Sequence, residues 1–197
     1  MGAFIVLEGI DGSGKSTACA RVADELRSRG LDVILTAEPT HDGIGAFIRS
    51  GNAGKVSQRA ESLLFTADRY EHTSEIRRQV SEGRVVVCDR YYPSTVAYQS
   101  AKLDGDSADL GWLKGLCEPF TDEPDAVILL DMDPEESMGR VEGRGLEESK
   151  FENIAFLRQV RSAYLDLARE FGYSVVDASR SADEVFRDVM TIIQEVV

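Results

Sequence analysis

Short apolar runs alternate with amphipathic segments along the whole chain. Five runs rich in valine, isoleucine and leucine have the length of single strands, and they cover residues 3–7, 32–37, 85–89, 126–131 and 173–177. The third and fourth runs are almost entirely apolar, which is typical of strands in a parallel sheet that is covered on both faces.

The segments between these runs predict helices. In the first, Ala18, Val22 and Leu26 recur every four residues, which places them on one face of a helix. In another, Pro134 stands at the opening position, where its missing N–H costs little. The predicted helices cover residues 17–29, 45–50, 57–81, 94–102, 108–118, 134–141, 151–171 and 182–195. Strands that alternate with helices predict a doubly wound α/β domain with right-handed connections.

The composition indicates one globular domain. A chain of 197 residues is long enough to bury its own core, so residues 1–197 are interpreted as a single domain. Hydrophobic residues make up 43% and charged residues 29%, which is typical of a folded protein. The net charge of −13 argues against a nucleic-acid partner, because nucleic acids are bound by basic surfaces.

The cysteines and the apolar runs bear on whether the chain is a disulfide-bonded, zinc-binding, membrane or secreted protein. Cys19, Cys88 and Cys117 are isolated, so neither a disulfide framework nor a zinc site is expected. No apolar run has the length that spans a bilayer, and no membrane partner is expected. The first apolar run lacks the basic region that opens a signal peptide, which makes the cytoplasm the expected location.

A phosphate-binding motif follows the first strand. Gly9, Gly14, Lys15 and Ser16 fit G-x-x-x-x-G-K-[ST]. An ordinary glycine-rich turn is the alternative, but a predicted strand before the motif and a predicted helix after it favour an anion site at the helix N-terminus. Lys15 is expected to reach the β- and γ-phosphates of ATP, and Ser16 to bind Mg²⁺. The residues expected to bind ATP here are Gly9, Ile10, Asp11, Gly12, Ser13, Gly14, Lys15, Ser16 and Thr17.

Polar residues follow the other strands, at the sheet edge where ligands bind in such folds. Asp89 ends the third run and is the expected second Mg²⁺ ligand, while Arg90 can grip phosphate oxygens. A structural Asp–Arg pair is the alternative. Asp131 ends the fourth run and is the rival metal ligand, although the residues after it suit a helix N-terminus.

Two further segments are candidates for function. Phe65 and Arg69 share a helix face and could stack and hydrogen-bond a base, although spacing alone favours Phe65 as a core residue. Residues 140–150 are charged, broken by glycine and without apolar periodicity. They are interpreted either as a lid that closes over a transferring phosphoryl group or as a solvated linker.

Taken together, these motifs resemble the thymidylate kinase family of P-loop nucleoside monophosphate kinases. The resemblance runs nearly end to end and rests on residues 4–17, 38–40, 64–69 and 89–99. It implies a P-loop NTPase-type sheet of five parallel strands with helices on both faces and a short lid at about residues 140–150. It also implies transfer of the ATP γ-phosphoryl group to dTMP, with Mg²⁺, in a homodimer that serves dTTP synthesis.

The resemblance assigns roles in binding dTMP. Phe65 would stack on thymine, which replaces the core interpretation, and Arg69 would bond its carbonyl edge. Tyr98 would pack beside the deoxyribose and exclude a 2′-hydroxyl, and Asp11 would approach the 3′-hydroxyl. The other residues implied at the dTMP site are Glu38, Ser94, Thr95 and Gln99, with Arg49 and Arg90 on the acceptor phosphate.

The resemblance also assigns the catalytic cations. Lys15, Arg90 and a lid arginine would neutralise the transferring phosphoryl group, with Asp89 on the metal. Because the phosphate loop has no arginine, the catalytic arginine would come from the lid, to which Arg140 and Arg144 would belong. Arg144 is preferred as the catalytic one, and Arg140 would bind ATP. The chain departs from many members by having Ala37 where they have an arginine, and by a less basic lid.

Two other functions remain open from the residues. A kinase for another nucleotide or for a deoxynucleoside would keep the same phosphate loop. A GTP-driven switch would fit residues 42–45, which match D-x-x-G, but the guanine-reading motif of such switches is absent from the sequence.

Overall fold

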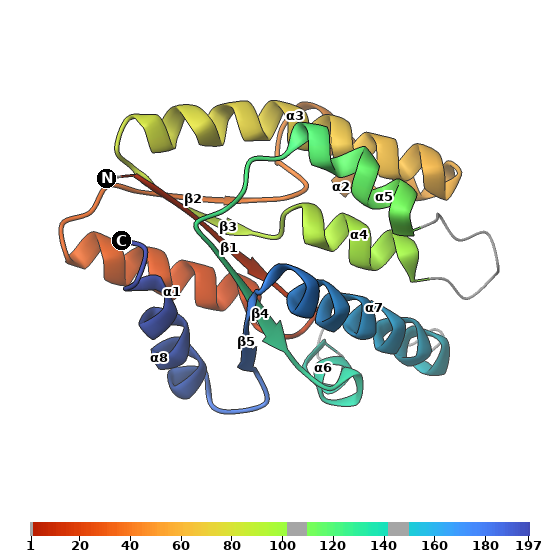
Figure 1. Cartoon of the computed structure of the whole chain (residues 1–197). Helices are drawn as coiled ribbons and strands as arrows, with labels where there is room; N and C mark the ends of the chain where they lie inside the picture. Colours follow the sequence, from red (N-terminus) through yellow and green to blue (C-terminus); the bar gives the residue numbers. More distant parts are fainter. Residues whose placement is uncertain (1, 102–109, 142–149) are drawn as a thin grey trace.

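Five parallel strands form one sheet, as the sequence predicts, and the structure gives their order as β2-β3-β1-β4-β5 (Figure 1). In this computed structural model, residues 2–101, 110–141 and 150–197 are described. The strands are β1 (Ala3–Glu8), β2 (Val33–Ala37), β3 (Val85–Asp89), β4 (Ala126–Asp131) and β5 (Ser174–Asp177). The central strand β1 pairs with β3 on one side and with β4 on the other.

All the predicted helices are present, with small differences at their ends. They are α1 (Lys15–Ser28), α2 (Gly43–Arg49), α3 (Gln58–Ser81), α4 (Tyr92–Ser100), α5 (Leu110–Cys117), α6 (Pro134–Val141), α7 (Lys150–Phe171) and α8 (Ala182–Ile193). The start of α4 at residue 94 was wrong by two residues, because Pro93 is accommodated in the first turn. The sequence pattern missed two short 3₁₀ turns, at Ala53–Lys55 and Glu118–Phe120.

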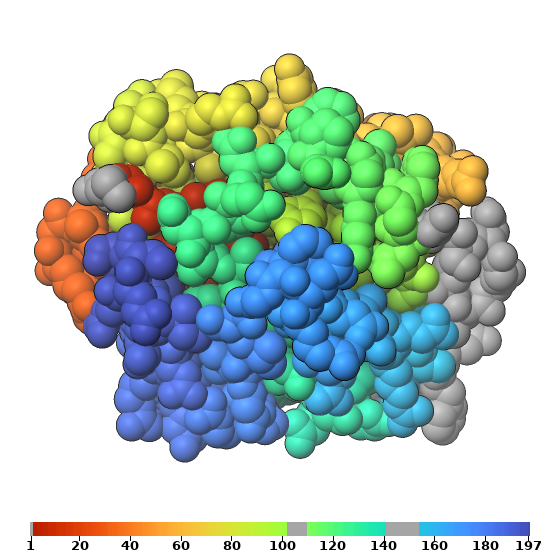
Figure 2. Space-filling model, viewed as in Figure 1, coloured from red at the N-terminus to blue at the C-terminus, as the bar shows by residue number. Residues whose placement is uncertain are grey.

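The side chains of β1 alternate between two apolar cores. Phe4 and Val6 point to the core beneath α3, α4, α5 and α7, whereas Ile5 and Leu7 point to the core beneath α1 and α8. This alternation follows from the two-residue period of a strand. In the space-filling view the helices cover most of the sheet (Figure 2).

Because β1, β2 and β3 are parallel, the loops that leave their carboxyl ends lie at one edge of the sheet. Backbone bonds hold them there: the Arg90 N–H donates to the Leu7 carbonyl, and the Glu38 N–H donates to the Asp89 carbonyl. Within the described ranges, no helix is both long and apolar enough to cross a membrane.

Candidate active site

Two cavities open at this edge of the sheet. The first, of about 800 Å³, lies between the β2 and β3 ends and helices α3, α4 and α7. The second, of about 930 Å³, lies over the loop between β1 and α1. Asp11 and Arg90 line both cavities, so these two residues mark the place where the cavities meet.

The phosphate loop forms the floor of the second cavity. Gly14 adopts a left-handed conformation (φ 92°) directly before α1, which opens the helix N-terminus towards the cavity. A Cβ on Gly9 would lie 2.6 Å from the Leu130 carbonyl oxygen, so glycine is required there. Residues 11–17 line the cavity, while Gly9 and Ile10 are buried beside it.

Lys15 is a nearly buried cation on this floor. Its Nζ donates to the Ile10 carbonyl at 2.8 Å, and its side chain is only slightly exposed. Burial, helped by the Arg90 charge, lowers the pKa of Lys15 to about 8, against the opposing effect of Asp11, Asp89 and Glu8. A phosphate in the cavity would supply the negative charge that a buried ammonium group requires.

Ser16 and Asp89, the two residues that the sequence predicts as Mg²⁺ ligands, contact each other. The Ser16 hydroxyl donates to Asp89 Oδ2 at 2.5 Å, and Asp89 Oδ1 is buried without a hydrogen-bond partner among the described residues. The rival, Asp131, instead accepts two hydrogen bonds from Arg161, from Nε at 2.7 Å and from Nη2 at 2.8 Å.

The Ser16–Asp89 pair could supply part of the ligand shell of a Mg²⁺ ion, but not a complete shell of protein ligands. No group of three histidine, cysteine or acidic side chains within the described ranges could hold a metal ion. Mg²⁺ commonly takes one or two protein oxygens and completes its shell with substrate phosphates and water. The orphaned Asp89 Oδ1, the Ser16 hydroxyl and the adjacent phosphate loop provide such a partial shell.

Arg90 is fixed between the two cavities. Its Nη2 donates to Asp11 Oδ1 at 2.6 Å, and its Nη1 donates to the Gly9 carbonyl at 3.1 Å. Burial alone would lower the pKa of Arg90, but the oxygens of Tyr98, Tyr164, Asp11 and Glu8 raise it well above the usual value. Arg90 also has a φ of 74°, an unusual conformation for a side chain of this size. The guanidinium is therefore permanently charged and held in place.

Glu8 is a buried carboxylate that the sequence analysis did not assign to any contact. It is completely buried at the end of β1 and accepts hydrogen bonds from the Tyr91 N–H, the Ser94 hydroxyl and the Tyr164 hydroxyl. Burial raises the pKa of Glu8. The only sequence signal for Glu8 was an acidic residue at the end of an apolar strand. There was no sequence signal for Tyr164, which lies 156 positions from Glu8.

The first cavity gathers most of the residues predicted to bind dTMP. Phe65 is half-buried on its wall, and Tyr98 stands where the cavity meets Asp11, with its hydroxyl 3.2 Å from Asp11 Oδ2. Burial raises the pKa of Tyr98 to about 12, so it stays protonated. The predicted residues that line this cavity are Asp11, Glu38, Phe65, Arg69, Arg90, Ser94, Thr95, Tyr98 and Gln99.

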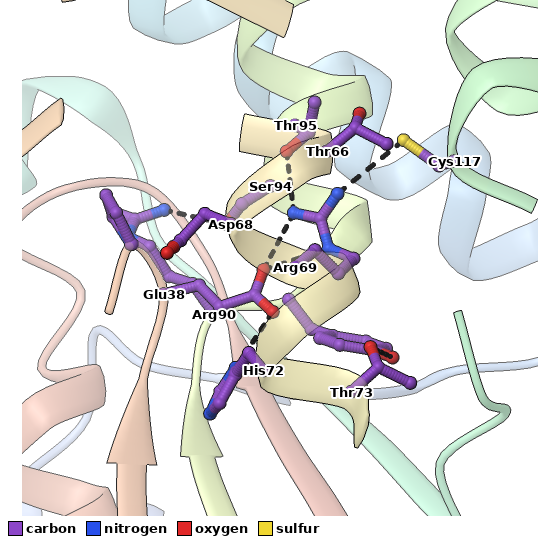
Figure 3. A network of polar contacts seen from close by, with 12 residues as sticks. Glu38, Thr66, Asp68, Arg69, His72, Thr73, Arg90, Ser94, Thr95 and Cys117 are labelled. Carbon is purple, nitrogen blue, oxygen red and sulfur yellow. Dashed lines mark hydrogen bonds and ion pairs between the residues drawn. The ribbon is translucent and has the colours of Figure 1, made fainter. Parts of the chain in front are cut away.

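Arg69 lies inside a network of polar contacts at the wall of this cavity (Figure 3). Its Nε donates to Glu38 Oε2 at 2.9 Å, and its Nη2 donates to the Thr95 hydroxyl at 2.8 Å. Burial alone would lower the pKa of Arg69, but the Glu38 carboxylate raises it. Glu38 is thus the partner of Arg69, a role that the sequence did not indicate.

Three predicted arginines have different surroundings. Arg49 lines neither cavity, and its Nε donates to the carbonyls of Pro39 and Thr40 at 2.8 and 3.1 Å. Arg140 is exposed and lines the second cavity. Arg144 and most of the predicted lid lie outside the described residues. Two further arginines that the sequence did not indicate, Arg21 and Arg180, also line the second cavity.

Comparison with known proteins agrees with this arrangement. A family model described as thymidylate kinase matches residues 7–189. A probable thymidylate kinase of Thermococcus onnurineus (strain NA1) is 40% identical over 204 residues, which cover 97% of each chain. A probable thymidylate kinase of Pyrobaculum aerophilum is 41% identical over 198 residues, covering 99% of this chain and 98% of the relative. The chain therefore belongs to the thymidylate kinase family.

Proposed function

We propose that this chain transfers the γ-phosphoryl group of ATP to dTMP and releases dTDP and ADP. The observation that carries the proposal is the meeting of the two cavities at Asp11 and Arg90. One cavity is floored by a phosphate loop, and the other offers an aromatic ring and a guanidinium. Two bound nucleotides would thus meet end to end, with their phosphates at the junction.

In the proposed donor site, the backbone N–H groups of the phosphate loop and Lys15 bind the β- and γ-phosphates. Ser16 and Asp89 hold Mg²⁺, which when bound neutralises phosphate charge and orients the transferring group. Arg21, Arg140 and Arg180 line the same cavity and can contact the rest of the ATP molecule.

In the proposed acceptor site, Phe65 stacks on thymine and Arg69 donates to its carbonyl edge. Tyr98 packs beside the deoxyribose, and Asp11 approaches the 3′-hydroxyl. Arg90 binds the acceptor phosphate, which is already a nucleophile and requires no strong base. We further propose that Arg49 joins Arg90 there by leaving its carbonyl partners.

The protein therefore acts by positioning two polyanions and by neutralising the charge between them. Lys15 lies in the cavity of the phosphate loop and Arg90 lies at the junction, and Arg144 of the predicted lid would complete the set. Closure of the lid would exclude water, which otherwise could take the phosphoryl group. We also propose a homodimer, as the family resemblance implies, and the cytoplasmic location expected from the sequence.

An ADP-release assay with ATP and Mg²⁺ tests the function directly. The acceptors are dTMP, dUMP, dCMP, dAMP, dGMP, UMP and thymidine. We expect strong turnover with dTMP and little with UMP or thymidine. The 2′-hydroxyl of UMP would clash with Tyr98, and thymidine has no phosphate for Arg90 to bind. Preferred turnover of another monophosphate or of thymidine would refute the dTMP assignment while keeping the phosphate loop. ATP binding without any turnover would contradict kinase activity altogether.

A further inference from the structure

A chain of buried hydrogen bonds runs from Arg69 through Glu38 to His72 (Figure 3). Glu38 accepts from Arg69 through Oε2 and contacts His72 Nδ1 through Oε1, at 3.0 Å. The other ring nitrogen of His72, Nε2, lies 2.8 Å from the Thr36 hydroxyl on β2. Glu38, Arg69 and His72 are all at least nine-tenths buried, so solvent does not replace these contacts.

The helix itself places the members of this chain together. Phe65, Arg69 and His72 follow one another on α3 at intervals of four and three residues, which puts them on one face. Phe65 and Arg69 line the cavity, and His72 lies one turn further along, behind them. The helix face that supplies the Phe65 ring and the Arg69 guanidinium thus also supplies His72, which contacts the Arg69 partner Glu38.

The contacts of Arg69 leave little freedom in its direction. A guanidinium has five N–H donors in a planar fork. Glu38 Oε2 lies 2.9 Å from Nε and 2.7 Å from Nη2, and Thr95 takes the second Nη2 hydrogen. Cys117 Sγ lies 3.7 Å from Nη1. With these contacts made, one hydrogen of Nη1 has no partner among the described residues, on a side chain that lines the first cavity.

His72 determines the position of the Glu38 carboxylate in this arrangement. When Nδ1 carries the proton, it donates to Glu38, and Nε2 accepts from the Thr36 hydroxyl. Both carboxylate oxygens then have a fixed partner, one on each side. Without His72, Oε1 would lose its donor and the carboxylate could rotate, taking the guanidinium with it.

We propose that His72 is a positioning residue for base selection: through Glu38 it aims Arg69 at the carbonyl edge of the acceptor's pyrimidine. This inference rests on the proposed function, since it concerns the same acceptor site. His72 would then contribute to specificity for a base that carries a carbonyl group at that edge, although His72 does not touch the substrate.

The test compares two acceptors and a matched set of variants. The acceptors are dTMP and the corresponding monophosphate of 5-methyl-2-pyrimidinone deoxyriboside, which lacks the carbonyl that Arg69 would contact. His72→Leu removes both ring nitrogens, whereas His72→Asn keeps a donor near the Nδ1 position. The chain's other histidine, His41, is exposed, and His41→Leu is the matched control.

We expect the unmodified protein to prefer dTMP over the analogue by about tenfold or more in kcat/KM, the size of one hydrogen bond to a charged group. His72→Leu should reduce this preference to within about threefold, mainly through the KM for dTMP, while the KM for ATP is unchanged. His72→Asn should restore part of the preference, and His41→Leu should leave it intact. Equal losses on both acceptors in His72→Leu would show a merely structural role and overturn the inference.

Calorimetric binding of the two acceptors separates this inference from the proposed function. If dTMP binds with the expected preference but is not phosphorylated, the proposed reaction is refuted. Base selection is then tested by comparing the affinities of the variants for the two acceptors. If the unmodified protein shows no preference, the inference is overturned. Should His72→Leu not fold, Thr36→Val removes only the outer contact of His72, and an unchanged preference in that variant would count against the proposal.

Discussion

Removal of the Tyr164 hydroxyl tests the buried network that holds Arg90 beside the phosphate loop. This hydroxyl lies 2.9 Å from Glu8 Oε2, 2.7 Å from Ser94 Oγ and 3.2 Å from Arg90 Nη1. The ring is 2% exposed, so water does not replace the lost contacts. Tyr164→Phe keeps the ring packing and deletes only the oxygen.

The expected magnitude follows from what remains after the deletion. Glu8 keeps the Tyr91 N–H at 2.7 Å and the Ser94 hydroxyl at 2.6 Å. Arg90 keeps the Gly9 carbonyl and Asp11. The loss is thus the hydrogen bond donated to Glu8 together with the longer one accepted from Arg90, about 2 kcal/mol or more in the free energy of unfolding. For a chain of this size, that corresponds to a decrease of about 4–8 °C in Tm.

Urea denaturation and thermal melting of Tyr164→Phe measure this loss against a matched control. Tyr70→Phe removes a hydroxyl from a ring that is 54% exposed, and its stability should stay within about 0.5 kcal/mol of the parent. If Tyr164→Phe is as stable as Tyr70→Phe, the reasoning that the buried hydroxyl stabilises the Glu8–Arg90 arrangement is wrong.

Three further predictions concern the chemistry. Lys15→Ala should lower kcat by about 10²-fold or more, because it removes a preorganised cation from the transferring phosphoryl group; near-normal turnover would remove Lys15 from the proposed site. Phe65→Ala should raise the dTMP KM by about tenfold with little change in the ATP KM, the size of one base–aromatic stack, whereas unchanged dTMP affinity would make Phe65 a core residue. Asp89→Asn should raise the Mg²⁺ concentration needed for half-maximal turnover, and chelation with EDTA should abolish turnover in the parent; an unchanged Mg²⁺ requirement in the variant would exclude Asp89 as a ligand.

The phosphate loop could be predicted from sequence because its chemistry is local. The residues from Gly9 to Ser16 are adjacent, and the strand and helix that flank them are set by apolar patterns of the same short range. The parallel sheet could be predicted for a similar reason, since strands that alternate with helices are joined by crossover connections.

The lateral contacts of the site depended on long-range packing. Asp89 meets Ser16 across 73 positions, a pairing that the phosphate-loop rule anticipates. No comparable rule predicted that Asp131 pairs with Arg161, that Glu38 pairs with Arg69, or that Arg49 lies outside both cavities. Hydrogen-bond partners of this kind depend on side-chain direction, which the spacing of residues in sequence does not specify.

The sequence alone thus determined the alternation of strands and helices, the anion site at the first helix and the family resemblance. Each of these depends on adjacent residues or on a repeated pattern. Only the tertiary structure decided that two cavities meet at Asp11 and Arg90, and that the buried Glu38 carboxylate pairs with Arg69. The physical reason is burial: a charged group taken out of water requires a partner, and the packing of distant elements determines which partner is within reach.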